Sequence, residues 1–334
     1  MMPAEQSPRG YVCCRAAHPP AFDGRLTEGV WAAAAWTADF VDIEGDIQPA
    51  PRFRTRAKML WDDTYFYIAA EMEEPHVWAT LTERESVIFQ DNDFEVFLDP
   101  DGDNHSYFEL EINALGTVWD LRLVKPYRDG GPALNEWHTP GLKQAVHIDG
   151  TLNDPTDTDR GWTVELALPW ADMAEHAGRP VPPKDGEQWR VNFSRVEWDV
   201  TVENGAYQKV PNRPEHNWVW SPQGAIDMHR PERWGFVQFS DAPPGTDEFR
   251  PDPSLPARDL LMAVYHAQHA YHNAHGQWAD TLTQLPLPTS PLTDTLRLTL
   301  TPDGFTATAE YLTYDSTPAR LSVRADSRLW AGET

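Results

Sequence analysis

The sequence predicts a mainly β fold, an antiparallel β-sandwich followed by a small α+β appendage. Three observations support this prediction. Short apolar segments separated by turn residues recur between about residues 21 and 240. A Pro-rich stretch then interrupts the pattern at 241–256. Beyond it, apolar residues recur at helical spacing over 260–282, and strand-like segments follow.

The strands of the sandwich are expected where apolar and polar residues alternate or where aromatic residues cluster. Residues 56–61 and 65–72 flank Asp62-Asp63-Thr64, which predicts a β-hairpin. A short helix is expected at 169–173, where a proline opens the segment. The same reasoning predicts further strands at 94–98, 107–113, 117–124, 143–148, 161–168, 189–198 and 234–239.

The domain organisation follows from these changes in pattern. We expect an N-terminal arm at 1–20, the sandwich at 21–240, a Pro-rich linker at 241–256 and a helix-plus-hairpin appendage at 257–334. The hairpin of the appendage is expected at 295–301 and 306–312. With about 80 residues, the appendage is near the lower size at which a domain folds alone.

The charge balance restricts the partners. The chain has 27 basic and 52 acidic residues, a formal net charge of -25. Such a surface repels nucleic acid and anionic lipid, so neither is an expected partner. No stretch approaches the roughly 20 apolar residues that a membrane span needs, so no membrane insertion is expected. Neutral ligands and cations remain.

The compartment is left open. The N-terminal residues lack a basic segment followed by an apolar run, so no signal peptide is visible and the chain as given is expected in the cytoplasm. Export is the alternative, if the start site is assigned too late. The two cysteines, Cys13 and Cys14, are neighbours and provide no disulfide framework.

Tryptophans concentrate in the segment 217–224, and Trp234 follows shortly after. Tryptophans beside amide side chains suit a sugar ring, because the indole face stacks and the amides hydrogen-bond. Core filling is the better interpretation for most of the 15 tryptophans. Phe89 and Trp137 fall in predicted loops, where the core does not account for them, so we expect them, with Trp119, in a stacking platform.

Acidic residues recur on the predicted strands at Glu95, Glu109, Glu111 and Glu165. Glu109 and Glu111 share one face of their strand, opposite Phe108 and Leu110. Three interpretations remain open: a sugar-binding sheet face, a polar face with Arg122 or Arg195 as counter-ions, and a carboxylate pair for glycoside hydrolysis.

Four oxygen-bearing side chains crowd the turn after residue 98. Calcium takes six to eight oxygen ligands, so this turn is a candidate calcium site, although it lacks the distal glutamate of an EF-hand. A solvated turn is the equal alternative. The candidate ligands are Asp99, Asp101, Asp103 and Asn104. The sequence contains no phosphate loop, nucleophile elbow, zinc-binding His-Glu-x-x-His or Cys-x-x-Cys motif.

Five segments form a recognisable series. The first is residues 22–31, with Asp23-Gly24 and Trp31, and the others follow in order at 60–67, 92–99, 109–113 and 161–165. Together they resemble carbohydrate-binding module family 9, one of the DOMON-like sandwiches of immunoglobulin-like or jelly-roll type. The resemblance covers roughly 21–240. It implies a two-sheet sandwich that binds sugars, that is often attached to glycoside hydrolases and that holds calcium in some members.

The resemblance also implies a site. Family members clamp a terminal sugar between two tryptophans; Phe89 takes the place of the first, and Met228 and His229 lie nearest to the second. Glu95 matches a sugar-contacting carboxylate, whereas Glu111 stands where those members have a basic residue. The expected sugar-contacting set is Phe89, Glu95, Glu111, Trp119, Trp137, Arg195, Met228 and His229.

The leading hypothesis is therefore a non-catalytic module that binds an oligo- or polysaccharide, with a glycoside hydrolase acting on the same glycan as the expected partner. One alternative is a glycoside hydrolase that uses Glu109, Glu111 or Glu95. A second is a haem-binding electron carrier, suggested by the Met228-His229 pair. Adjacent residues cannot readily ligate opposite faces of a haem, which disfavours it.

Overall fold

The computed structural model of the chain describes residues 7–27 and 29–332. The first six residues of the predicted N-terminal arm, Glu28 of the family-like motif and the last two residues of the predicted appendage lie outside this range. The chain divides into two compact units. One consists of Met1–Asp101, Ser106–Val124 and Pro132–Phe249; the other consists of Gly102–His105, Lys125–Gly131 and Arg250–Thr334.

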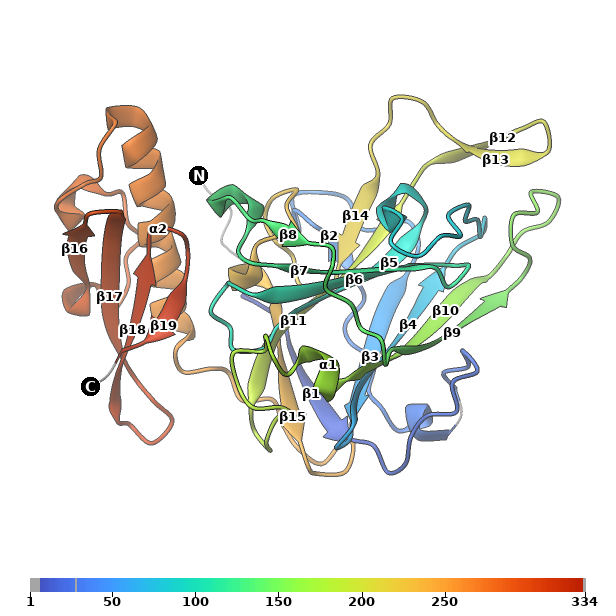
Figure 1. The fold of residues 1–334 in the computed structure, drawn as a ribbon, viewed down its shortest axis with the longest axis horizontal. Coiled ribbons are helices and arrows are strands. Elements are labelled where there is room, and N and C mark those ends of the chain that lie inside the picture. Colours follow the sequence, from blue (N-terminus) through green and yellow to red (C-terminus); the bar gives the residue numbers. More distant parts are fainter. Residues whose placement is uncertain (1–6, 28, 333–334) are drawn as a thin grey trace. The chain divides into compact units, whose positions relative to one another are not determined.

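The first unit is built on one curled 13-stranded sheet (Figure 1). Eleven strands follow the order β8-β7-β6-β5-β11-β15-β1-β3-β4-β10-β9, and two more lie off this path, with β14 paired to β11 and β2 paired to β14. The predicted strands are present, which confirms the mainly antiparallel sandwich. They are β3 (Thr55–Trp61), β4 (Tyr65–Glu73), β5 (Asp93–Asp99), β6 (Tyr107–Asn113), β7 (Val118–Leu123), β9 (Lys143–Asp149), β10 (Gly161–Pro169), β11 (Gln188–Glu197) and β15 (Gly235–Ser240).

Short elements complete the first unit. The helix predicted at 169–173 is α1 (Trp170–Met173), and short 3-10 turns are η1 (Gly29–Ala32), η2 (Ile88–Gln90) and η4 (Pro231–Arg233). The hairpin of β12 and β13 extends away from the main sheet (Figure 1). The strands that the sequence did not predict are β1 (Gly10–Arg15), β2 (Val41–Asp42), β8 (Ala133–Leu134), β12 (Val200–Glu203), β13 (Ala206–Lys209) and β14 (His216–Val219).

The segment predicted as an N-terminal arm contains β1, which joins the two halves of the curled sheet. It pairs in parallel with β15 on one side and with β3 on the other. Cys13 from this strand is fully buried in the core. The arm is therefore in part a strand of the sandwich.

The main core fills the space between the two halves of the sheet. Strand alternation supplies it, because every second side chain of β4 and β5 points inward. Trp218 and Trp220 of the tryptophan-rich segment are 3% and 1% exposed and belong to this core. That segment serves packing, and its rings are not available to stack on a ligand.

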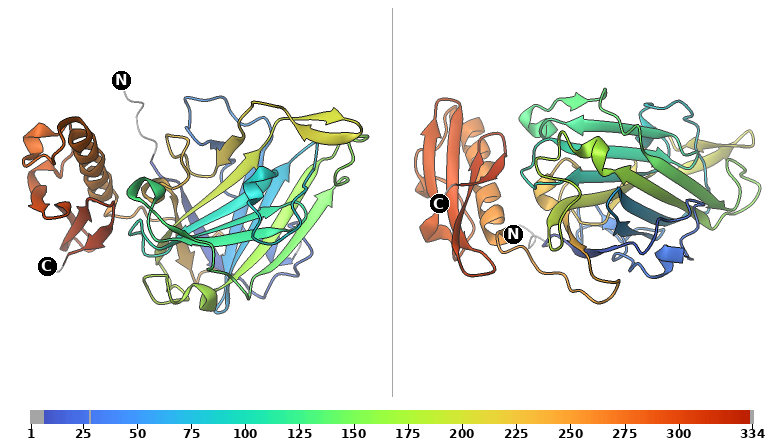
Figure 2. Two further views of the ribbon diagram at one scale, coloured as in Figure 1. Left: turned by 45° about the horizontal axis from the view of Figure 1, so that its top comes forward. Right: turned by 60° about the horizontal axis from the view of Figure 1, so that its bottom comes forward.

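The second unit combines one long helix with a four-stranded sheet. The helix α2 (Leu255–His275) packs on β17 and β18 across one face of that sheet (Figure 2). It ends at Gly276, whose φ of 71° is left-handed, so it is shorter than the periodicity over 260–282 suggests. The other elements are η3 (Tyr127–Asp129), η5 (Leu282–Gln284), η6 (Thr293–Thr295), β16 (Arg297–Thr301), β17 (Gly304–Leu312), β18 (Pro318–Arg324) and β19 (Leu329–Ala331).

Within residues 7–27 and 29–332, no helix is both long enough and apolar enough to cross a membrane.

Candidate functional site

The outward face of strands β5, β6, β7 and β11 carries an unusual number of carboxylates. On β5, Phe94, Val96 and Leu98 point into the core. The intervening residues, Asp93 and Glu95, therefore lie on the opposite face. We refer to this surface as the acidic face.

The register places the acidic residues of the two central strands side by side. Glu95 of β5 pairs with Glu111 of β6, and Glu111 pairs in turn with Trp119 of β7. On the other side, Glu95 faces Ser194 of β11. Glu109 precedes Glu111 by two residues on β6 and therefore lies on the same face. One row across the sheet thus holds an aromatic ring, two carboxylates and a hydroxyl.

These carboxylates are enclosed. Glu95 and Glu109 are 6% exposed, Glu111 is 2% exposed and Asp93 is fully buried. Burial raises the pKa of Glu95 to about 7. Burial, together with the charge of Glu95, raises the pKa of Glu109, Glu111 and Asp93 well above the ordinary range.

Aromatic side chains border the acidic face. The backbone N–H of Phe89, in η2, donates to Glu111 Oε2 at 2.9 Å. The indole N–H of Trp198 donates to the Phe89 carbonyl oxygen at 2.9 Å. The Lys209 ammonium lies 3.5 Å from the centre of the Trp198 ring. Phe89, Trp119 and Trp198 are all half-buried, so part of each ring remains available to a ligand.

Met228 and His229 also lie on this side of the sheet. Met228 packs in a cluster with Phe97, which is the residue opposite Glu109. The His229 ring nitrogen Nδ1 lies 3.0 Å from the Tyr107 hydroxyl oxygen. Six residues of the predicted sugar-contacting set therefore share one face: Phe89, Glu95, Glu111, Trp119, Met228 and His229.

The structure places the other two members elsewhere. The Trp137 ring packs on Phe108 with centroids 4.7 Å apart, and Phe108 belongs to the inward face of β6. Arg195 is 1% exposed and donates to Glu74 and Glu197 at 2.7 and 2.9 Å. Both were expected at the sugar. Arg195 lies on the inward side of β11 because strand alternation reverses the face at every residue. Trp137 lies in the loop after β8, and its ring turns toward the inward face of β6.

Arg122 and Arg195 are also not the counter-ions of the acidic face. Arg122 pairs across the sheet with Phe108, so it shares the inward side, and it donates to the Ser106 hydroxyl at 3.0 Å. Glu165, the fourth acidic strand residue, lies apart on β10 and accepts from the Gly24 backbone and the Trp31 indole. Its role is to hold the segment that contains Gly24 and Trp31.

Three residues of the acidic face were not expected at the site. Trp198 follows Ser194 and Val196 at two-residue spacing, so alternation along β11 was the signal that points to Ser194 and Trp198 together. Lys209 comes from β13, a hairpin strand of four residues. No sequence pattern placed that hairpin beside η2.

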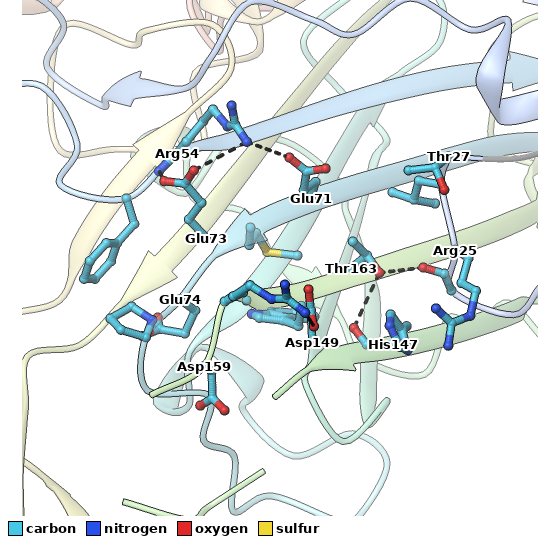
Figure 3. A pocket seen from close by; sticks show the side chains of 18 residues that line it. Arg25, Thr27, Arg54, Glu71, Glu73, Glu74, His147, Asp149, Asp159 and Thr163 are labelled. Carbon is cyan, nitrogen blue, oxygen red and sulfur yellow. Dashed lines mark hydrogen bonds and ion pairs between the residues drawn. The ribbon is translucent and has the colours of Figure 1, made fainter. Parts of the chain in front are cut away.

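A separate cleft of ≈ 670 Å³ is lined by the segment 24–27 and by residues of strands β4, β9 and β10 (Figure 3). Arg54 forms ion pairs with Glu71 at 3.0 Å and Glu73 at 3.4 Å, and Figure 3 shows these side chains together along one wall. Thr163 donates to the Gly24 carbonyl at 2.5 Å. The charged groups of this wall are paired with one another.

A comparison with known families assigns the fold unit that carries the acidic face. The model of the carbohydrate family 9 binding domain-like family matches residues 22–238, which is more than half of the chain. The chain belongs to this family. The resemblance over 21–240 is thereby confirmed.

Relatives of this family 9 member are distant. An exoglucanase, XynX of Acetivibrio thermocellus, is 25% identical over 154 residues, which is 46% of this chain. The match spans only 12% of that enzyme's length. A crystal structure of a Bacteroides uniformis protein proposed to bind carbohydrate has a TM-score of 0.52 at 15% identity, covering 70% of this chain and all of that one. This second likeness shows the fold alone.

A family 9 module from Caldicellulosiruptor kristjanssonii, solved in complex with cellotriose, has a TM-score of 0.46 at 13% identity. It covers 72% of this chain and 98% of that module. The family match supports neither the hydrolase nor the haem-carrier alternative.

The candidate calcium turn of this family 9 chain crosses the boundary between the two units, because Asp99 and Asp101 belong to the first and Asp103 and Asn104 to the second. Carboxylate and amide oxygens are ligands that suit a hard cation. The Asn104 amide nitrogen donates to the Ser327 carbonyl at 2.9 Å. Calcium binding at this turn stays a prediction.

Proposed function

We propose that the sandwich is a non-catalytic carbohydrate-binding module that holds an oligo- or polysaccharide over the acidic face. The observation that carries the proposal is the convergence of enclosed carboxylates with half-buried rings on one side of the sheet. Carboxyl oxygens accept hydrogen bonds from sugar hydroxyls, and aromatic faces pack on the apolar face of a sugar ring. Phe89, Trp119 and Trp198 supply those rings.

Binding fits this geometry better than hydrolysis. Glycoside hydrolysis needs two carboxyl groups whose environments push their pKa values apart, so that one is an acid while the other is ionised. Here the pKa values of Glu95, Glu109 and Glu111 are all shifted upward by burial. These shifts therefore do not assign one of the three as the acid and another as the ionised carboxylate.

We also propose that the module works with a glycoside hydrolase that acts on the same glycan. The support is the match to part of an exoglucanase, of which this chain spans only 12%. In that arrangement the module would raise the local concentration of the enzyme on its polymer.

Isothermal titration calorimetry with cello-, xylo- and manno-oligosaccharides tests the sugar site. Saturable binding is expected with the wild-type chain, and at least tenfold weaker binding with the Phe89→Ala/Glu95→Ala double variant. Arg54→Ala, in the cleft of Figure 3, is the matched control and is expected to bind as the wild type does. Circular dichroism confirms that each variant is folded.

Two results would contradict the proposal. The first is the absence of saturable binding to any glycan in a broad panel. The second is normal binding by the double variant with loss of binding in Arg54→Ala, which would move the ligand to the cleft. Each titration is run both in EDTA and in excess calcium, so that a dependence on cations is seen separately.

A further inference from the structure

Three carboxylates of the acidic face converge on one point. Asp93, Glu95 and Glu111 each offer an oxygen, and these three oxygens lie within 4.8 Å of one another. Asp93 and Glu95 are two residues apart on β5, and Glu111 lies directly opposite Glu95 on β6. Calcium–oxygen distances are about 2.4 Å, so oxygens this close together can all ligate one ion.

No ion pair among the described residues neutralises this cluster. Across the described residues, no lysine, arginine or histidine forms an ion pair within 4 Å of Asp93, Glu95, Glu109 or Glu111. Like charges directly opposite one another on a sheet are destabilising. Carboxylates removed from water are costly unless a cation or a metal accompanies them. The register nevertheless holds Glu95 and Glu111 side by side.

A second observation points to a missing ligand. Among the described residues, the Asp93 Oδ2 atom is enclosed and has no hydrogen-bond donor, whereas Oδ1 accepts from the Val196 backbone at 3.3 Å. The Ser194 hydroxyl is enclosed as well and lies beside the Glu95 carboxylate, directly opposite it in the sheet. Buried polar atoms are nearly always satisfied, so the orphaned Asp93 oxygen needs a partner. A cation satisfies it, because carboxylate and hydroxyl oxygens are lone-pair donors to a cation.

The geometry points to a divalent cation of calcium's size bound by Asp93, Glu95 and Glu111, with the Ser194 hydroxyl beside it. All the available ligands are hard oxygens, the set that calcium, magnesium and manganese prefer over zinc or copper. Calcium fits best, since magnesium requires distances near 2.1 Å and dehydrates reluctantly. The 6% exposure of Glu95 leaves the site in contact with the surface on which the sugar is proposed to bind.

The inference goes beyond the proposed function, and the two fail separately. Sugar binding in EDTA without any cation effect would leave the module intact and overturn the metal site. Cation binding by a chain that binds no sugar would support the metal site and overturn the proposed function.

The experiment measures bound calcium on the full chain. Protein stripped with EDTA is equilibrated with CaCl₂, desalted and analysed by inductively coupled plasma mass spectrometry, and its thermal midpoint is followed during the titration. Compared with the wild type, Glu111→Gln and Glu95→Gln are expected to lose one calcium per chain and the calcium-dependent rise in midpoint that it causes. Glu71→Gln, a carboxylate already paired with Arg54 and Arg56, is the matched control and keeps both.

A second set of variants separates this site from the turn at 99–103. Asp101→Asn is expected to leave the calcium of the acidic face in place. Ser194→Ala, which adds no charge or bulk, is expected to weaken calcium binding severalfold and guards against variants that fail to fold. Unchanged calcium content in Glu95→Gln and Glu111→Gln, or loss only in Asp101→Asn, would overturn the inference. So would a wild-type chain that binds no calcium while both glutamine variants are more stable, since the cluster would then hold protons.

Discussion

Single residues decide how the start of the sandwich is fastened to its sheet, and Lys58 shows this well. Its side chain is 3% exposed, and its Nζ donates to the carbonyl oxygens of Leu26 and Trp31 at 2.8 and 2.7 Å. The ammonium also lies 4.0 Å from the Trp36 ring centre. Burial, with a smaller contribution from the Arg56 charge, lowers the pKa of Lys58 to about 8.

The lowered pKa of Lys58 predicts a pH dependence of stability. Between about pH 8 and 10.5 the unfolded lysine retains its proton while the folded one loses it, so the unfolded chain binds more protons and the free energy of unfolding rises with pH. This gain in the free energy of unfolding is complete above the pKa of lysine in the unfolded chain, and it is lost as the pH falls through about 8. Chemical denaturation of the wild type and of Lys58→Met from pH 7 to 10.5 checks this. The free energy of unfolding of the wild type, minus that of Lys58→Met, should rise with pH. A difference that stays constant over this range would contradict the prediction.

The residues of the candidate site show where sequence reasoning succeeds and where it stops. Glu95, Glu111 and Trp119 could be placed together, because alternation and the family-like motifs fix their faces. Arg195 was misplaced although alternation along β11 puts it on the inward side with Val191 and Phe193, and it is Ser194 that lies opposite Glu95. Trp198 lies beyond the paired part of β11, where its position depends on η2.

At the scale of elements, long alternating segments were predictable and short ones were not. Strands β3, β4 and β6 have seven to nine residues with a clear pattern. Strands β2 and β8 have two residues each, too few for a period to show. β1 escaped for another reason. Its sequence GYVCCR resembles any short apolar segment, and only its partners, far along the chain, make it a strand.

The attachment of β1 to the other strands can be tested at Tyr11. Its hydroxyl donates to the Ala35 carbonyl at 2.6 Å and accepts from the Met59 backbone N–H at 3.1 Å. Tyr11→Phe leaves buried backbone groups without their partner, so we expect it to lower the free energy of unfolding by about 1–3 kcal/mol. Urea denaturation measures the loss. Tyr65→Phe is the matched control, because no hydrogen bond to the Tyr65 hydroxyl is present among the described residues, and it should change stability by less than about 0.5 kcal/mol. Equal effects in both variants would contradict the role given to Tyr11.

At the scale of the whole molecule, the net charge of -25 is expected to lower the affinity for anionic glycans relative to neutral ones. The field of this net charge repels uronate and sulfate groups. Composition alone predicted this exclusion of anions, whereas the location of the face needed the fold.

A glycan comparison tests the effect of charge. Neutral gluco- or xylo-oligosaccharides are expected to bind at least tenfold more tightly than uronate-rich or sulfated oligosaccharides of equal length at low ionic strength. The gap should narrow as salt is added, because screening shortens the reach of the protein's field to about 8 Å at physiological ionic strength. Titration at two salt concentrations measures it. Tighter binding of the anionic glycans would contradict the repulsion expected from the net charge.

The parallel strand β1 also constrains the order of events while the chain is being made. Gly10 pairs with Phe236, so the first strand leaves the ribosome long before its neighbour β15 exists. Until then, the backbone groups of β1 that pair with β15 have no strand partner, and the apolar side chains of β1 stay exposed. Closure of the curled sheet is therefore a late, long-range event, and such topologies fold slowly and expose unpaired edges meanwhile. We therefore expect the nascent chain to depend on chaperones until β15 has left the ribosome.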